Sequence, residues 1–135
     1  MADIFSKEKR SEIMSKIRSK NTSIEKAVFR ELAKRGVYFQ KHYKKAFGNP
    51  DVALPRKKKA VFIDGDFWHG YRFEKQKKRL ANKYWINKID TNIKRDRKNR
   101  LKLKKNGWKV FRIWEHEIER NFENSINKIE SFLIH

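Results

Sequence analysis

Two short apolar segments, each with an aspartate at or just after its end, constrain the fold more than any other part of this chain. Asp51–Leu54 is the first, and Ala60–Ile63, rich in the β-branched and aromatic residues that favour strands, is the second. Pro55–Lys59 between them is typical of a polar turn. The sequence therefore predicts a β-hairpin that brings Asp51 close to Asp64.

The acids of this hairpin are suited to a hard cation. Mg²⁺ prefers carboxylate and carbonyl oxygens as ligands, Mn²⁺ can substitute for it, and a bound cation lowers the pKa of its water. His69 follows Asp64 by five residues and offers a base for such a water. The pattern indicates a divalent-metal site that performs hydrolysis.

The segments around the hairpin alternate between helix and strand patterns. We expect, in chain order, a helix over about 23–35 ended by Gly36, a strand over Val37–Tyr43, a helix over about 82–106 stopped by Gly107, a well-buried strand over Trp108–Trp114, and a helix over about 124–133. The long helix then makes a β-helix-β crossover. The expected fold is α/β, with a mixed central sheet flanked by helices in one domain over 1–135, and residues 1–20 form an N-terminal arm or helix.

Two polar residues near the hairpin have simple local interpretations. Thr22 to Glu25 has the spacing of a capping box, in which Glu25 satisfies an amide at the helix start. Capping explains Glu25 without a metal and is preferred, and the alternative turns Glu25 towards the hairpin acids. His42 is expected to be a surface residue of its strand.

The charge of the chain points to a polyanionic partner. The formal net charge is +20, from 36 Lys and Arg against 16 Asp and Glu, which favours nucleic acid. A membrane surface is less favoured, because there is no long apolar run, lipidation signal or signal peptide. The absence of cysteine excludes disulfides and thiolate metal sites and fits a reducing cytosol. We expect a monomeric, cytoplasmic protein without a membrane partner.

The long helix carries much of this charge. Its apolar stripe is expected at Ile86, Ile89, Ile93 and Leu101, amid a basic run that includes Lys94, Arg95 and Arg97. The basic face is suited to lie along phosphates, although such a run on a helix is often only solvated.

Apolar residues in two other segments have two interpretations each. Phe67 and Trp68 either pack under their long loop or stack on bases. Met14 and Ile17 share one face of the N-terminal segment, which is either a solvated arm that packs lightly or a surface pressed against DNA.

The ordered set of motifs resembles the very-short-patch-repair endonucleases, the Vsr-type members of the Pro-Asp…(Asp/Glu)-x-Lys nuclease superfamily, over nearly the full length. The specific part is the Phe-Trp-His set after the second acid. The resemblance rests on Arg10-Ser11 through Met14, Thr22 to Glu25, Pro50-Asp51, Phe62 to Gly65, Phe67 to His69, Trp85 with Lys88-Ile89, Arg95 to Arg97, Gly107-Trp108 and Trp114-Glu115.

The resemblance implies a restriction-endonuclease-like fold and an enzyme that uses Mg²⁺ to nick duplex DNA on the 5′ side of the thymine in a T·G mismatch. It implies that Asp51 and the backbone carbonyl of Ile63 hold the metal. His69 would then handle the proton of the attacking water, while Asp64 supports the metal or its waters and Glu25 shapes the site.

The same resemblance assigns the DNA contacts. Phe67, Trp68 and Trp85 would insert beside the mismatch from the major groove, and Met14 and Ile17 would approach the other groove. Two further functions stay open: a Vsr-like restriction or structure-selective endonuclease, and a basic nucleic-acid-binding module without catalysis.

Two departures from the family pattern limit the transfer. Asp66 stands where the superfamily has lysine, so His69 would do the proton work. Related enzymes also tend to hold a structural zinc through Cys and His, whereas this chain has no cysteine. We expect that zinc to be absent, with Asp66 and His116 near its place as a possible contact, and a mixed Asp/His zinc site is the alternative.

Overall fold

The computed structural model describes residues 23–65 and 83–135. The expected N-terminal arm and the loop after the hairpin lie outside these residues. Seven residues with predicted roles fall in these two segments, and their roles stay predictions: Met14, Ile17, Thr22, Asp66, Phe67, Trp68 and His69.

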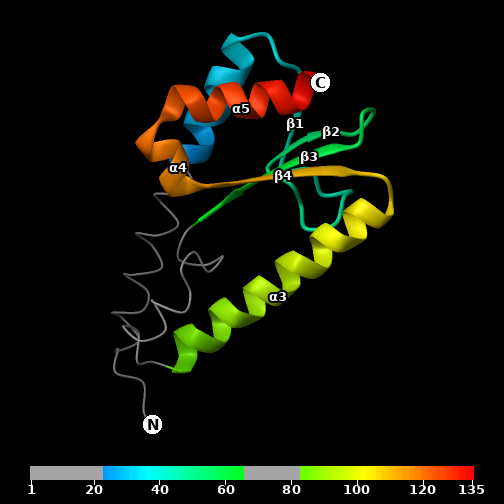
Figure 1. Ribbon diagram of the computed structural model, residues 1–135, viewed down its shortest axis with the longest axis vertical. Coiled ribbons are helices and arrows are strands. Elements are labelled where there is room, and N and C mark those ends of the chain that lie inside the picture. Colours follow the sequence, from blue (N-terminus) through cyan, green and yellow to red (C-terminus); the bar gives the residue numbers. More distant parts are fainter. Residues whose placement is uncertain (1–22, 66–82) are drawn as a thin grey trace.

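Four strands form the sheet of the described chain, in the order β1-β2-β3-β4 (Figure 1). Strand β2 is antiparallel to both β1 and β3, and β4 runs parallel to β3 after the helical crossover. The predicted hairpin and the mixed sheet are confirmed. The strands are β1 (Gln40–Lys41), β2 (Val52–Leu54), β3 (Lys59–Asp64) and β4 (Lys109–Trp114).

Helices cover both faces of this sheet because β3 alternates its apolar side chains between them. Val61 and Ile63 belong to a core shared with the helix over residues 23–34 and the two C-terminal helices. Ala60 and Phe62 face the opposite core, which is closed by Leu103 of the long helix. Figure 1 shows the long helix, α3, on one side of the sheet and the C-terminal helices on the other.

Helix α3 (Lys83–Lys105) has the predicted extent, but its buried stripe differs from the prediction. Leu101 is 60% exposed, whereas Leu103 and Ile89 are buried. Successive helical residues are rotated by about 100°, so a residue fourteen positions after Ile89 returns close to its face, and one twelve positions after it does not. Leu103, and not Leu101, therefore packs on the sheet.

The strand expected over Val37–Tyr43 is reduced to β1, and both of its ends have a local cause. The amide of Val37 donates to the Leu32 carbonyl at 3.0 Å and so completes the end of the preceding helix. At the other end, His42 has a φ of 46° and turns the chain out of the ladder. His42 is thus a turn residue, and its prediction as a strand residue was wrong.

Strand β4 is less buried than predicted. Ile113 is its buried residue, and the neighbouring side chains are half-buried or exposed. The reason is its place at the end of the sheet, where one long edge lacks a strand neighbour among the described residues.

The C-terminal region contains one helix more than the sequence predicted. Helix α4 (Glu115–Arg120) follows β4 directly, and α5 (Phe122–Ile134) follows after Asn121, whose side chain accepts a hydrogen bond from the Asn124 amide at 3.1 Å. The predicted apolar face of α5 is confirmed at its buried positions, Ile126, Ile129 and Leu133. Within the described residues, no helix has the length and apolar character needed to cross a bilayer.

Candidate metal centre

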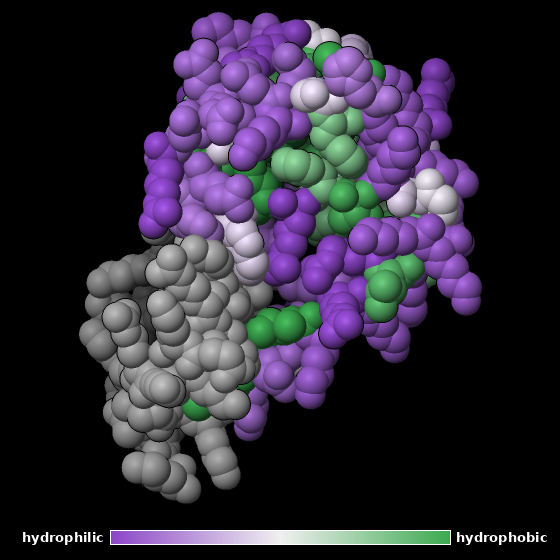
Figure 2. Space-filling model, in the orientation of Figure 1, coloured by the Kyte–Doolittle hydropathy of each residue, from purple (hydrophilic) through white to green (hydrophobic). Residues whose placement is uncertain are grey.

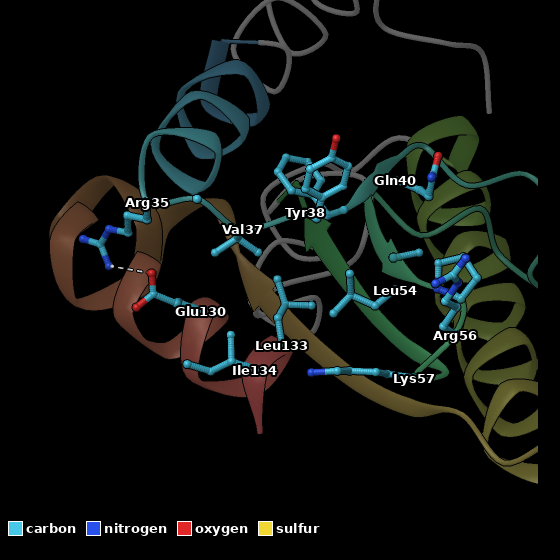
Figure 3. Close-up of a pocket in the computed structure, with 14 residues that line it drawn as sticks. Arg35, Val37, Tyr38, Gln40, Leu54, Arg56, Lys57, Glu130, Leu133 and Ile134 are labelled. Carbon is cyan, nitrogen blue, oxygen red and sulfur yellow. Dashed lines mark ion pairs between the residues drawn. The ribbon is translucent and has the colours of Figure 1, made fainter.

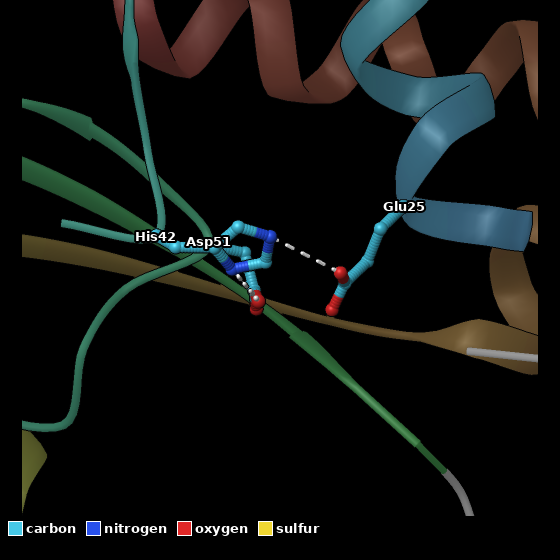
Figure 4. A group of neighbouring side chains, drawn as sticks. All are labelled: Glu25, His42 and Asp51. Atoms are coloured by element: carbon cyan, nitrogen blue, oxygen red, sulfur yellow. Dashed lines mark ion pairs between the residues drawn. The ribbon is translucent and has the colours of Figure 1, made fainter. Parts of the chain in front are cut away.

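Three side chains that could bind a metal ion gather where the hairpin begins (Figure 4). Glu25 comes from the helix over residues 23–34, His42 follows β1, and Asp51 precedes β2. One potential ligand atom of each lies within 4.8 Å of the others. His42 Nε2 is 3.4 Å from Glu25 Oε2, and His42 Nδ1 is 3.7 Å from Asp51 Oδ1.

Asp51 occupies an environment that disfavours its negative charge. Burial raises the pKa of the Asp51 carboxyl well above its usual value, and the nearby Glu25 carboxylate raises it further. The hydrogen bond that Asp51 Oδ2 accepts from the Ile63 amide at 2.7 Å acts in the opposite direction and fixes the carboxylate. Two such carboxylates lose their mutual repulsion when they share a cation, so these residues fit a divalent metal ion.

Glu25 faces this cluster, as the alternative interpretation expected, and its capping contact with Thr22 stays a prediction. The capping pattern considers only neighbours in the sequence, whereas the fold places His42 and Asp51 beside the helix that carries Glu25. Thr22, the proposed capping partner, lies outside the described residues.

Sequence analysis missed His42 as a member of this cluster. Its amide donates to the Asp51 carbonyl at 3.0 Å, and its ring meets the Phe29 ring edge-on with 5.5 Å between centroids. Positive φ is uncommon outside glycine, and strained backbone of this kind is concentrated at functional sites. The sequence signal that could have identified His42 is its position shortly before Pro50-Asp51. This spacing indicates a site only when the turn after β1 is known to bring His42 next to Asp51.

Asp64 lies in a different ionic environment from the one predicted. Asp64 is a buried residue, 4% exposed, and its carboxylate pairs with the Arg112 guanidinium. That guanidinium also lies over the Trp114 ring, 4.1 Å from the ring centroid. Of the groups that raise the pKa of Asp51, Asp64 has the smallest effect. The structure thus brings Asp51 to the Ile63 amide and pairs Asp64 with Arg112, and metal binding by the Ile63 carbonyl stays a prediction.

The predicted DNA-contacting residues of α3 differ in accessibility. Trp85 is 1% exposed, and its ring meets the Tyr84 ring edge-on. The Trp85 ring is therefore not at the surface of the structure, where the expected contact with bases would be made. Lys94, Arg95 and Arg97 are exposed. Figure 2 shows hydrophilic residues over much of the visible surface, including along α3. The basic face is therefore accessible to phosphates.

A groove with a volume of about 920 Å³ lies away from this cluster (Figure 3). Apolar side chains such as Val37, Leu54 and Leu133 line it. Its acidic residue, Glu130, is engaged by Arg35 with 3.9 Å between charged atoms. The groove includes none of the three metal-binding candidates, and we do not assign it a catalytic part.

The mixed sheet between two helical layers is that of an α/β restriction-endonuclease-like fold, and the paired carboxylates at the start of its hairpin are suited to a divalent metal ion. Residues 2–83, more than half of the chain, match the family of the DNA mismatch endonuclease Vsr. The chain belongs to this family, which confirms the resemblance.

Curated relatives agree with this assignment. The chain is 41% identical over 120 residues to the type II nicking enzyme V.NmeAIP of Neisseria meningitidis serogroup A / serotype 4A, a match that covers 88% of this chain and 86% of the relative. It is 36% identical over 121 residues to V.NmeDIP of N. meningitidis serogroup C, covering 88% and 82%. It is 33% identical over 118 residues to the DNA mismatch endonuclease Vsr of Escherichia coli strain K12, covering 85% and 74%. The chain is a DNA endonuclease.

Proposed function

We propose that this endonuclease uses Mg²⁺, with Mn²⁺ as a substitute, to nick duplex DNA on the 5′ side of the thymine in a T·G mismatch. The observation that carries the proposal is the Glu25–His42–Asp51 cluster in a chain of the Vsr family. We further propose that the enzyme acts on DNA as a monomer. Its proposed place is the bacterial cytoplasm, because the relatives are bacterial proteins.

The residues at the site have distinct proposed roles. Asp51 and the carbonyl of Ile63 bind the ion, and Glu25 places a second carboxylate beside it. The ion, when bound, lowers the pKa of a water and stabilises charge on the phosphate. His69 accepts the proton of that water. The hydrogen bond from the Ile63 amide holds the Asp51 carboxylate in place, so that no reorientation precedes binding.

Cleavage of defined duplexes tests this function. Duplexes with T·G, A·T or C·G at one position, labelled separately on each strand, are incubated with Mg²⁺, Mn²⁺ or EDTA. We expect one nick, 5′ of the mispaired thymine, with either ion and none with EDTA. Equal cutting of all three duplexes favours the restriction-type alternative, and cuts in both strands contradict nicking.

The salt dependence of DNA binding tests the basic face of α3. Each phosphate neutralised contributes about −0.9 to the slope of log affinity against log salt. We expect a steep negative slope for the protein and a slope shallower by about two for the double variant Lys94→Gln/Arg97→Gln. Lys128→Gln, an exposed change on α5 across the sheet, serves as the control. Equal slopes for the α3 variant and the control would remove α3 from the DNA interface.

A further inference from the structure

We propose that His42 is a metal ligand, which completes a site of two carboxylates and one imidazole and shifts its preference from Mg²⁺ towards Mn²⁺. The inference rests on the proposed function, since it requires a metal ion at Asp51. It adds to that function a residue and an ion preference.

The first support is the way the imidazole is held. The amide of His42 donates to the Asp51 carbonyl at 3.0 Å, so the two residues share one backbone contact. The Phe29 ring packs against the imidazole. The side chain is therefore positioned by its backbone and by one face, while its nitrogen atoms are directed at Glu25 and Asp51 (Figure 4).

The second support is the backbone of His42 itself. A φ of 46° is uncommon for a residue with a side chain, although His, Asn and Asp adopt it more often than other residues do. This conformation turns the chain directly after β1, so that the imidazole of His42 lies beside Glu25 and Asp51.

Donor chemistry determines which ion benefits. Mg²⁺ prefers oxygen ligands and an octahedral shell rich in water, whereas first-row transition-metal ions bind imidazole nitrogen more readily, and Mn²⁺ is the one among them that shares the carboxylate and water ligands of Mg²⁺. Adding one nitrogen to two carboxylates therefore increases the affinity for Mn²⁺ more than the affinity for Mg²⁺.

A simpler role for His42 predicts the opposite result. Its side chain is 52% exposed, and as a protonated imidazole it would neutralise Glu25 and Asp51 in place of a metal. In that role His42 competes with the ion, and removing the imidazole raises the metal affinity. If His42 is a ligand, removing the imidazole lowers the metal affinity.

The test measures metal binding by the full-length protein without DNA. The free Mn²⁺ signal in electron paramagnetic resonance gives the Mn²⁺ affinity, and displacement of bound Mn²⁺ by Mg²⁺ gives the Mg²⁺ affinity. We expect His42→Asn, which keeps a residue suited to positive φ, to weaken Mn²⁺ binding by about tenfold or more, the scale on which metal sites respond to loss of a supporting group. Mg²⁺ binding should weaken less. His135→Asn, an exposed change at the C-terminal end of α5, should bind as the wild type does.

A spectroscopic readout keeps the test independent of the variant's stability. Pulsed electron paramagnetic resonance of Mn²⁺ bound to wild-type protein with isotopically labelled histidine should show coupling between the ion and a histidine nitrogen. The His42→Asn variant should lose this coupling. Absence of the coupling in the wild type, its persistence in His42→Asn, or an equal or higher Mn²⁺ affinity of His42→Asn overturns the inference.

Asp51→Asn separates this inference from the proposed function. If that variant loses Mn²⁺ binding while His42→Asn does not, the metal site stands and the role of His42 is wrong. If Asp51→Asn binds Mn²⁺ as the wild type does, the metal site of the proposed function is wrong, and the ligand role of His42 falls with it.

Discussion

Asp51→Asn should abolish DNA cleavage and, in the metal-free protein, increase the free energy of unfolding at neutral pH. The activity falls because the variant loses an anionic metal ligand. A catalytic ion supplies several kcal/mol of transition-state stabilisation, so we expect a loss of at least about 10³-fold. DNA affinity should stay equal or increase, because the change removes a negative charge that faces phosphate.

The gain in stability follows from the raised pKa of Asp51. Burial and the Glu25 carboxylate make the ionised form less favourable in the folded protein than in the unfolded chain. Each unit by which the pKa is raised corresponds to about 1.4 kcal/mol of penalty on the ionised folded form. Asparagine has no charge to bury, and its carbonyl oxygen can accept the Ile63 amide as Asp51 does. Functional sites commonly sacrifice stability in this way.

The pH dependence has a defined sign. Below about pH 3.9, the usual value for an unfolded aspartate, Asp51 is protonated in both states and imposes no penalty. As the pH rises from there through the raised pKa of the folded protein, the folded state holds the proton longer, and stability falls. Above that pKa the penalty is constant. Asp51→Asn should remove this component of the decline.

Chemical denaturation in EDTA at several pH values, together with cleavage of T·G duplex, measures both effects. Asp90→Asn is the matched control, since Asp90 is a half-exposed acid paired with Lys94 at 3.0 Å on α3. It should change stability by no more than about 0.5 kcal/mol. An Asp51→Asn variant that is less stable than the wild type at neutral pH would contradict the account of a disfavoured charge.

Local sequence patterns correctly predicted those elements whose signal lies within a few adjacent residues. The hairpin followed from two apolar runs around a polar turn, and Gly107 ended α3 with a φ of 85°, as expected. Leu101 was misassigned because an apolar residue near the end of a basic helix fits a stripe by composition, while only its rotation about the axis determines burial. The extent of β1 depended on a left-handed His42, which composition does not reveal.

The candidate site was predicted less completely, because its geometry depends on contacts distant in the sequence. Asp51 was recognised from its position at a strand, and Glu25 was weighed between two partners. His42 was overlooked because only the turn after β1 brings its ring to both acids. Asp64 was grouped with Asp51 through the hairpin, but the parallel pairing of β3 with β4 places it next to Arg112. A linear motif identifies the acids and leaves their partners undetermined.

Arg112→Leu should destabilise the protein by about 3–5 kcal/mol, the cost of breaking the ion pair of a buried carboxylate by removing the cation. Asp64 is the carboxylate concerned. The double variant Asp64→Leu/Arg112→Leu should lose much less, because replacing both charges by apolar groups removes the buried charge as well. Denaturant unfolding of the two single variants and the double variant gives the coupling energy directly. Losses that simply add would contradict the ion pair.

The same residues decide what Asp64 contributes to the metal site. In the structure its carboxylate forms an ion pair with Arg112, so we expect Asp64→Asn to retain wild-type Mn²⁺ affinity and to lose stability alone. If Asp64 were a metal ligand, as the motif predicts, Asp64→Asn would instead weaken Mn²⁺ binding by about tenfold or more. Arg112→Gln completes the comparison: it would strengthen binding if Arg112 competed with the ion for Asp64, and it should leave the affinity unchanged if the pair is structural. A lower affinity for Asp64→Asn together with a higher affinity for Arg112→Gln would therefore restore Asp64 to the metal site.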